Sequence, residues 1–74
     1  MSIETLTAVI QKEGDIYTSL CPELDIASQG SSIEGARDNL AEALELFFQT
    51  ADPTEIRERL HRETLVTTVQ VPLG

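Results

Sequence analysis

The sequence predicts an α+β domain in which an antiparallel sheet of three to four strands packs on one long helix. Apolar and polar residues alternate in residues 3–29 and again in residues 64–71, which is typical of strands with one buried face. Between these segments the apolar residues recur at intervals of three and four, which is typical of an amphipathic helix. The chain has 74 residues, so we expect a single domain over residues 1–74.

The first two strands should form a hairpin. Residues 3–12 and residues 15–21 both alternate between apolar and polar side chains. Gly14 lies between them and can adopt the positive φ that a tight turn requires, so the two strands should run antiparallel. Pro22 has no amide hydrogen to donate to a neighbouring strand, so pairing should stop there. Residues 25–29 then form a short third strand.

A long helix should follow, capped by Ser31 or by Ser32. Ser31 would form a capping box with Glu34, and either serine could accept a hydrogen bond from the first turn. Gly35 weakens that turn by about 0.5–1 kcal/mol relative to alanine. The apolar residues of the helix form one wide stripe that should face the sheet: Ile33, Ala36, Leu40, Ala43, Leu44 and Phe47, with Phe48 at its margin.

A second, short helix and a last strand complete the predicted chain. Asp52 is a good N-cap, Pro53 suits the first helical position, and Glu55 lies three residues after the cap. Residues 64–71 then alternate again, and Pro72 ends them. The predicted order is therefore strand, strand, strand, helix, short helix, strand.

The composition argues against several classes of function. The net charge is −8, with five Lys and Arg residues against thirteen Asp and Glu, which is unfavourable for direct binding of nucleic acid. An acidic chain more naturally meets a basic partner. The sequence has neither a signal-peptide pattern nor about 18 consecutive apolar residues, which predicts a cytoplasmic protein with no membrane contact. Cys21 is the single cysteine, so no internal disulfide can form.

No group of residues has the pattern of a catalytic, cofactor-binding or metal-binding site, so we do not expect an enzyme. His61 lies in a charged turn, and Cys21 precedes a proline in an acidic neighbourhood. The alternative is a divergent nuclease that would hold Mg²⁺ with Asp15, Glu23 and Asp25. Solvated turn acids are the simpler interpretation, because the alternation does not place these three residues together on one buried face.

The outer face of the long helix is the main candidate for binding a partner. Glu34, Asp38 and Glu42 follow one another at intervals of four residues, and Glu45 continues the row. Like charges with this spacing destabilise a helix, and only Arg37 offers local relief. A solvated helix face would also explain the row, but it is the surface on which we expect a basic partner to bind.

A second copy of the chain is the other expected partner. A core in a domain of this size usually contributes only about 3–5 kcal/mol, so association is a natural source of further stability. One helix covers one face of the sheet and leaves the other face and the strand edges open. The side chains expected there are Thr7, Val9, Tyr17, Val66 and Thr68. We therefore expect a homo-oligomer, either a dimer or a larger assembly.

The stretch from Tyr17 to Leu44 combines a tyrosine strand, a Cys-Pro-Glu-Leu bend, a Gln-Gly-Ser-Ser corner, and a helix with Ala and Asn-Leu at fixed offsets. In this order and spacing the elements resemble the HicB-like antitoxin family. The matching residues are Tyr17, Cys21, Pro22, Glu23, Leu24, Gln29, Gly30, Ser32, Glu34, Ala36, Asn39, Leu40, Glu42 and Ala43. The resemblance covers roughly residues 3–48.

The resemblance implies a partial RNase H-like fold and a role in a toxin–antitoxin system. HicB-like antitoxins cover HicA toxins, which are small basic proteins that cleave mRNA. Many members also carry a C-terminal DNA-binding module, and this chain is expected to be a short, standalone member without one. The function that follows is neutralisation of a HicA-type toxin by occlusion.

Further candidate contacts for such a toxin are Tyr17, Glu23 and Asp25, in addition to the acids of the long helix. Two alternatives to the antitoxin remain open. One is a solitary HicB-like homo-oligomer without a toxin partner, and the other is the Mg²⁺-dependent nuclease.

Overall fold

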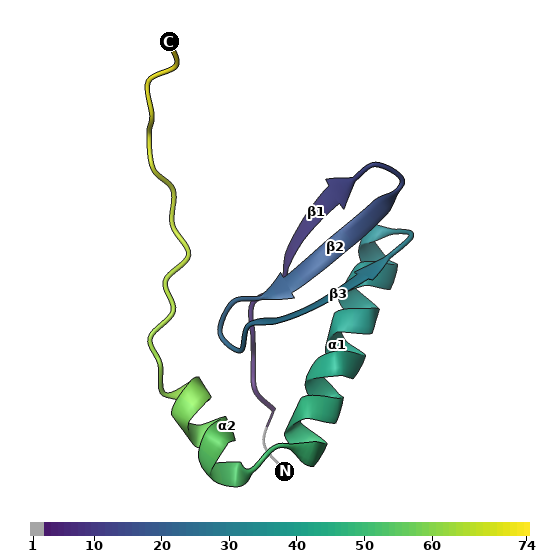
Figure 1. Cartoon of the computed structure of the whole chain (residues 1–74), viewed down its shortest axis with the longest axis vertical. Helices are drawn as coiled ribbons and strands as arrows, with labels where there is room; N and C mark the ends of the chain where they lie inside the picture. The colour runs from purple at the N-terminus through teal and green to yellow at the C-terminus, as the bar shows by residue number, and fades with distance from the viewer. Residues whose placement is uncertain (1–2) are drawn as a thin grey trace.

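The structure is a computed structural model that describes residues 3–74 and has two layers, a sheet and a helix that crosses one of its faces (Figure 1). The sheet is antiparallel and three-stranded, in the order β1-β2-β3. The elements within the described residues are β1 (Val9–Glu13), β2 (Ile16–Cys21), β3 (Ile26–Gly30), α1 (Ile33–Thr50) and α2 (Pro53–Leu60). The α+β class and the order of these five elements confirm the prediction.

The β1–β2 hairpin closes through a two-residue turn. Gly14 has φ 63° and Asp15 follows it, so glycine occupies the first central position, as in a type II′ turn. The register runs from Glu13 opposite Ile16 to Val9 opposite Leu20. The strand predicted for residues 3–12 begins only at Val9, because its partner strand ends at Cys21 and leaves nothing opposite the residues before Ala8.

The bend between β2 and β3 turns on Asp25, which has φ 54°. Aspartate tolerates this left-handed conformation better than most residues do, which explains an aspartate rather than a bulky residue at this position. The bend drives Leu24 into the core, where it is buried with Cys21 and Leu40. The third strand spans residues 26–30, one residue later than predicted.

Helix α1 is capped by Ser32, not by Ser31. The Ser32 side chain accepts a hydrogen bond from the Gly35 amide at 2.9 Å. Of the predicted stripe, Leu40 is only 1% exposed, whereas Ile33 in the first turn is 52% exposed. The residues of α1 that pack partly buried against the core are Leu44, Phe47 and Phe48.

The start of α1 lies directly on β3 and β2. A Cβ at Gly30 would lie 2.5 Å from the Ala36 backbone nitrogen, so only glycine allows this close approach. One strand away, the buried Ser19 hydroxyl donates to the Ala36 carbonyl oxygen at 2.9 Å. These contacts position the N-terminal half of α1, and with it the residues on its outer face.

Helix α2 begins as predicted, with Asp52 as its N-cap and Pro53 in its first turn. Arg59 ties the helix to the rest of the molecule. Its Nη1 donates to the Leu24 carbonyl at 2.8 Å, its Nη2 pairs with Glu55 at 2.9 Å, and its guanidinium lies 5.1 Å from the centre of the Phe47 ring.

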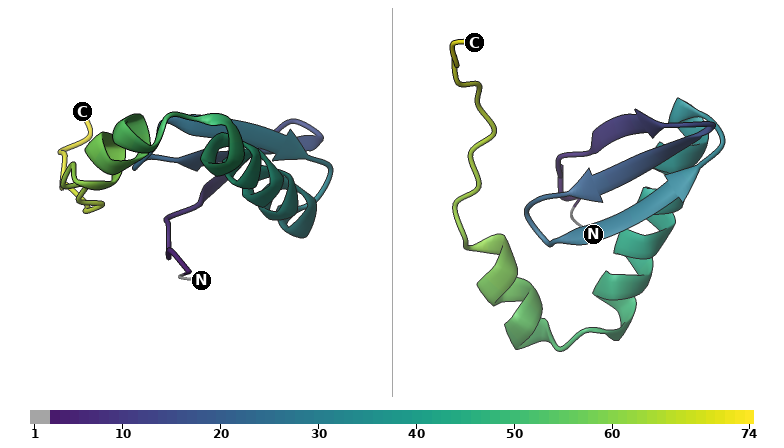
Figure 2. Two further views of the ribbon diagram at one scale, coloured as in Figure 1. Left: turned by 90° about the horizontal axis from the view of Figure 1, so that it is seen from below. Right: turned by 45° about the horizontal axis from the view of Figure 1, so that its top comes forward.

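The prediction of a fourth strand at residues 64–71 is wrong for this chain on its own. These residues are extended and belong to a segment, residues 64–74, that we call the tail. The tail leaves the end of α2 and stays apart from the sheet in all the views (Figures 1 and 2). Arg59 holds α2 against the β2–β3 bend, and the tail that follows α2 does not pair with the sheet (Figure 1).

The burial pattern of β2 shows which residues lie on the face of the sheet that α1 covers. Ser19 and Cys21 are buried against α1, and by alternation Tyr17 lies on the same face and is half-buried. The prediction that Tyr17 lies on the uncovered face is therefore wrong. Val9 does lie there, because its register partner Leu20 points away from α1.

Candidate protein-interaction surface

The predicted acidic row of α1 forms one continuous stripe in the structure. At 3.6 residues per turn, Glu34, Asp38, Glu42 and Glu45 fall within an arc of about 80° around the helix. All four residues are exposed. The arc lies opposite the side of α1 that carries the buried Ala36 and Leu40, so it faces away from the sheet. We call these four residues the acidic stripe.

The acidic stripe has little local compensation. The Arg37 guanidinium approaches Asp38 at 3.8 Å, and both side chains are largely exposed, so this pair contributes little. Three of the five basic residues of the chain are Arg57, Arg59 and Arg62, in α2 or just after it. The negative charge of α1 is therefore available to a cationic partner.

Glu23, a second candidate contact, holds the fold together instead of projecting into solvent. Its Oε2 accepts hydrogen bonds from the Thr7 amide at 2.9 Å and the Thr7 hydroxyl at 2.7 Å. Desolvation acts to raise the pKa of Glu23, but these hydrogen bonds outweigh it and lower the pKa below its ordinary value. Within the chain, Glu23 is a structural hydrogen-bond acceptor, and its role as a partner contact stays a prediction.

The acids proposed for a metal nuclease do not converge. Asp15 lies in the turn at one end of β2, whereas Glu23 and Asp25 lie in the bend at its other end. Asp25 is exposed and serves the turn through its positive φ. Within residues 3–74 no three His, Cys, Asp or Glu side chains form a group that could hold a metal ion.

The two remaining reactive side chains have structural surroundings. Cys21 is fully buried, and this burial raises the pKa of its thiol, which contacts Glu23 Oε1 at 3.5 Å. A buried thiol with a raised pKa is a poor nucleophile. His61 is the exposed C-cap of α2, and its amide donates to the Arg57 carbonyl.

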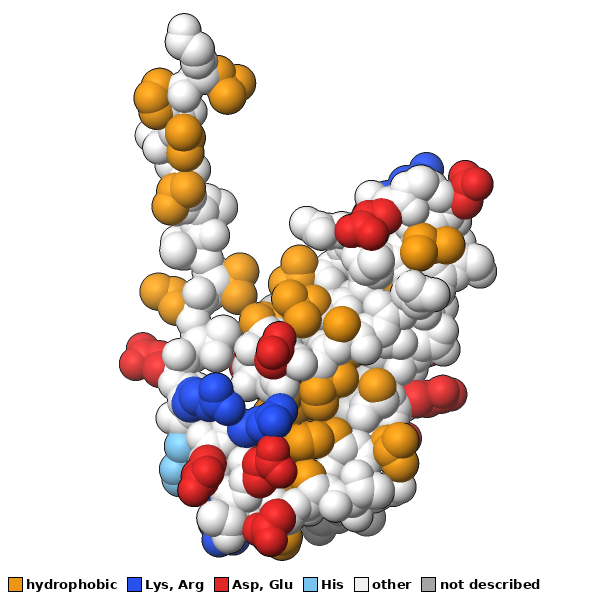
Figure 3. Space-filling view, viewed as in Figure 1, with side chains coloured by type: hydrophobic (Ala, Val, Ile, Leu, Met, Phe, Trp, Pro, Cys, Tyr) orange, Lys and Arg blue, Asp and Glu red, His pale blue; other side chains and the backbone are white. Residues whose placement is uncertain are grey.

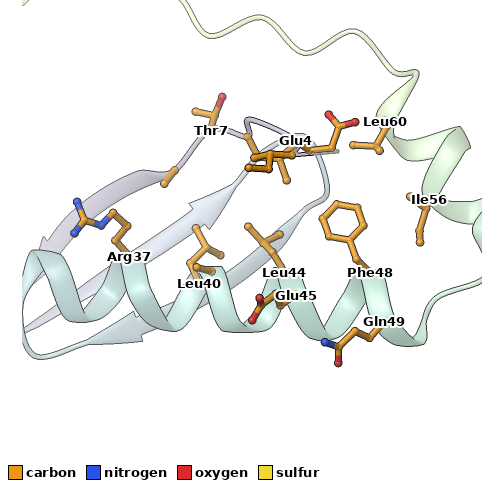
Figure 4. Close-up of a pocket in the computed structure, with 14 residues that line it drawn as sticks. Glu4, Thr7, Arg37, Leu40, Leu44, Glu45, Phe48, Gln49, Ile56 and Leu60 are labelled. Atoms are coloured by element: carbon orange, nitrogen blue, oxygen red, sulfur yellow. The ribbon is translucent and has the colours of Figure 1, made fainter. Parts of the chain in front are cut away.

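An apolar groove, which the sequence analysis did not predict, runs between the segment before β1 and the two helices (Figure 4). Leu40, Leu44 and Phe48 point into it from α1, and Leu60 of α2 lies toward one end. Glu45 lies at its rim, so the groove adjoins the acidic stripe. The groove brings the segment before β1 together with the distant α1 and α2, and the sequence signals for it were the apolar stripe of α1 and the apolar Leu6 before β1.

The uncovered face of the sheet carries a second apolar feature. Val9, Leu20 and Ala27 are cross-strand partners and form one row across all three strands. Val9 and Leu20 are each more than one third exposed. The space-filling view shows hydrophobic side chains both on the body of the domain and along the tail (Figure 3). Three apolar surfaces (the groove, the uncovered face of the sheet and the tail) and one acidic surface are thus available to partners.

Within the part of the chain that the structure describes, no helix is both long enough and apolar enough to cross a membrane. Comparison of the chain with protein-family models, with curated proteins and with solved structures gave no significant match.

Proposed function

We propose that this chain is a protein-binding module that neutralises a small basic, mRNA-cleaving toxin of HicA type in the cytoplasm. The observation that carries the proposal is the acidic stripe, four exposed carboxylates on the outer face of α1 with one weak ion pair among them. The resemblance of residues 3–48 to HicB-like antitoxins supplies the class of partner.

The proposed mechanism is occlusion. A protein that binds RNA does so with a cationic surface, because Lys and Arg must neutralise the phosphates. A surface of opposite charge is attracted to that same face and blocks it once bound. The mechanism needs one contact surface per toxin and no catalytic group of the antitoxin. It is therefore consistent with the structural surroundings of Glu23, Cys21 and His61.

The closest alternative is a solitary homo-oligomer that has no toxin partner. The exposed apolar tail and the apolar groove favour self-association, whether or not a toxin exists. Self-association through the tail and groove and toxin binding through the acidic stripe would share only Glu45, so the two functions are compatible. The nuclease is the weakest alternative, because Asp15 lies at the opposite end of β2 from Glu23 and Asp25.

The test is binding to the small basic protein encoded beside this chain. The wild-type chain should suppress cleavage of RNA by that protein stoichiometrically. The association rate should fall as the salt concentration rises past about 0.15 M, where the Debye length is about 8 Å. The triple variant Glu34→Lys, Asp38→Lys, Glu42→Lys should slow association at least about tenfold and keep the circular dichroism spectrum of the wild type.

The matched control is the triple variant Glu13→Lys, Glu58→Lys, Glu63→Lys. It changes the net charge by the same amount at exposed positions outside α1. Equal slowing in both triple variants would show that net charge alone steers the encounter. The acidic stripe would then not be the surface that contacts the toxin. Absence of binding to any neighbouring gene product would reject the antitoxin function itself.

A further inference from the structure

The tail has the properties of a strand without a partner. Its eleven residues carry no charge, and residues 64–71 alternate as a strand does. Leu65 is 80% exposed and Val69 is 81% exposed. Within the described residues, no backbone hydrogen bond joins the tail to another segment. A run of exposed apolar side chains of this length is a mark of an interaction site.

The dimensions of the whole molecule point the same way. A compact monomer of this mass should expose about 4,500 Å², whereas this chain exposes 6056 Å². Its radius of gyration is 14.4 Å, against about 11 Å for a compact domain of this length. The excess exposed surface is about 1,500 Å² per chain. For two chains the excess is larger than the roughly 1,200–2,000 Å² of surface that a stable interface buries.

The structure also contains a matching acceptor at the β1 edge of the sheet. Helix α1 packs mainly beneath β3 and β2 and makes little contact with β1. The apolar groove, with Leu6, Leu44 and Phe48 in its lining, is therefore left open below this edge (Figure 4). A strand added beside β1 would pair with its free backbone groups and would cover the groove with alternate side chains.

The β3 edge is a poorer acceptor. The Asn39 side chain on α1 donates from Nδ2 to the Gln29 carbonyl at 2.7 Å and so occupies a backbone acceptor of β3. Helix α1 also packs closely along this strand. Strand β1 spans Val9–Glu13, so five of the eight residues at positions 64–71 are enough to pair along this edge.

We propose that two copies of this chain exchange their tails, so that residues 64–71 of each copy form a fourth strand beside β1 of the other. Arg59 fixes the origin of the tail at the β2–β3 bend, and the chain's own tail passes the sheet without joining it. In a dimer with twofold symmetry, each tail lies beside β1 of the other copy, and the same contact forms twice. In each copy Leu65, Val69 and Val71 face the groove. This inference does not depend on the proposed function.

The first measurement uses the unmutated, full chain. Light scattering at micromolar concentration should give twice the mass of 8.1 kDa. In a sample mixed from isotope-labelled and unlabelled chains, isotope-filtered NOE spectra should connect the methyl groups of Val69 and Val71 in one copy with those of Leu6 and Leu44 in the other. A monomer would overturn the proposal. So would filtered contacts that join Val9 to Leu20, because they would indicate packing through the uncovered sheet face.

The second measurement compares two single substitutions in the tail. Val69→Asp places a charge in the groove of both copies and should raise the dimer Kd at least about 100-fold. Gln70→Asp adds the same charge on the opposite side of the same strand and should change the Kd less than about fivefold. An unchanged Kd for Val69→Asp would overturn the proposal. The filtered NOEs of the unmutated chain decide the matter if Val69→Asp does not fold.

Discussion

The Glu23 carboxylate joins two segments of the fold that are distant in the sequence. It accepts two hydrogen bonds from Thr7, which lies before β1, and thereby fastens the N-terminal segment to the β2–β3 bend. That segment forms one wall of the apolar groove. Glu23, which the sequence suggested as a partner contact, therefore holds one wall of the apolar groove in place through Thr7.

The pH dependence of unfolding should report this contact. The pKa of Glu23 in the folded chain lies below its ordinary value of 4.5, so its contribution to stability is complete above that value. It should be lost as the pH falls further, through the folded-state pKa. In urea titrations from neutral pH downward, Glu23→Gln should therefore show a flatter pH dependence than the wild type.

Thr7→Val provides a companion variant of nearly the same shape. It keeps the amide donor and removes the hydroxyl donor, so it should cost about 1 kcal/mol at neutral pH and should weaken the pH dependence in part. If all three proteins had the same pH dependence, Glu23 would not be the group that titrates.

At the scale of the elements, the position of α1 is set by its N-terminal half. Gly30 permits backbone contact with Ala36, and the Ser19 hydroxyl meets the Ala36 carbonyl. The C-terminal half packs through larger side chains, among them Phe47, which also contacts Arg59 of α2. The helix is thus fixed closely at one end and buried more loosely at the other.

This difference predicts an order of mutational effects along α1. Leu40→Ala should cost about 2–5 kcal/mol, because the side chain is fully buried in the core. Phe47→Ala should cost less, because the ring is only partly buried. Ile33→Ala is the control at an exposed position and should change stability by less than about 0.5 kcal/mol. Urea melts give all three values, and a larger loss for Ile33→Ala would show that the assigned helix face is wrong.

The elements that the sequence predicted well are those governed by local interactions. The period of α1, the Asp52 cap and the Gly14 turn all depend on residues within a few positions of one another. The face of Tyr17 was predicted wrongly because it depends on which residues of β2 meet α1, and that contact joins distant segments. The start of β1 was missed for the same reason, since the end of β2 decides it.

The candidate surfaces also differ in whether local interactions or contacts between distant segments form them. The acidic stripe could be read from the helical period alone, because its four residues belong to one helix. The apolar groove could not, because it requires the relative positions of α1, α2 and the segment before β1. Residues 64–71 have the pattern of a strand, but no strand within residues 3–74 pairs with them. A local pattern predicts that a strand can form and does not identify its neighbour.

At the scale of the whole molecule, the acidic and apolar surfaces are distinct and meet at Glu45, which belongs to the acidic stripe and lines the groove. The acidic stripe lies on the outside of α1, whereas most of the exposed apolar residues lie on the tail, in the groove and on the uncovered face of the sheet, with Ile33 and Leu46 exposed on α1. A basic partner and a second copy of the chain would therefore approach different parts of the molecule. Dimerisation through the tails leaves Glu34, Asp38 and Glu42 of the stripe outside the covered groove, whose lining includes Glu45.

Exchange of tails makes stability depend on concentration. If unfolding also separates two chains, each tenfold rise in protein concentration stabilises the dimer by about 1.4 kcal/mol. For a dimer of this total length the melting temperature should then rise by about 3–6 °C. Scanning calorimetry of the wild type over two decades of concentration measures this rise. The same series on Val69→Asp should show no such dependence, and a constant melting temperature in the wild type would contradict tail exchange.

The burial of Cys21 has a practical consequence. The chain has a single thiol, it is fully enclosed, and its raised pKa keeps it protonated at neutral pH. An alkylating reagent can reach it only when β2 separates from α1, so the rate of alkylation measures how often the domain opens. One mass-spectrometric time course would thus follow the opening free energy of the unmodified chain, even in a cell extract, without a purified sample or an introduced probe.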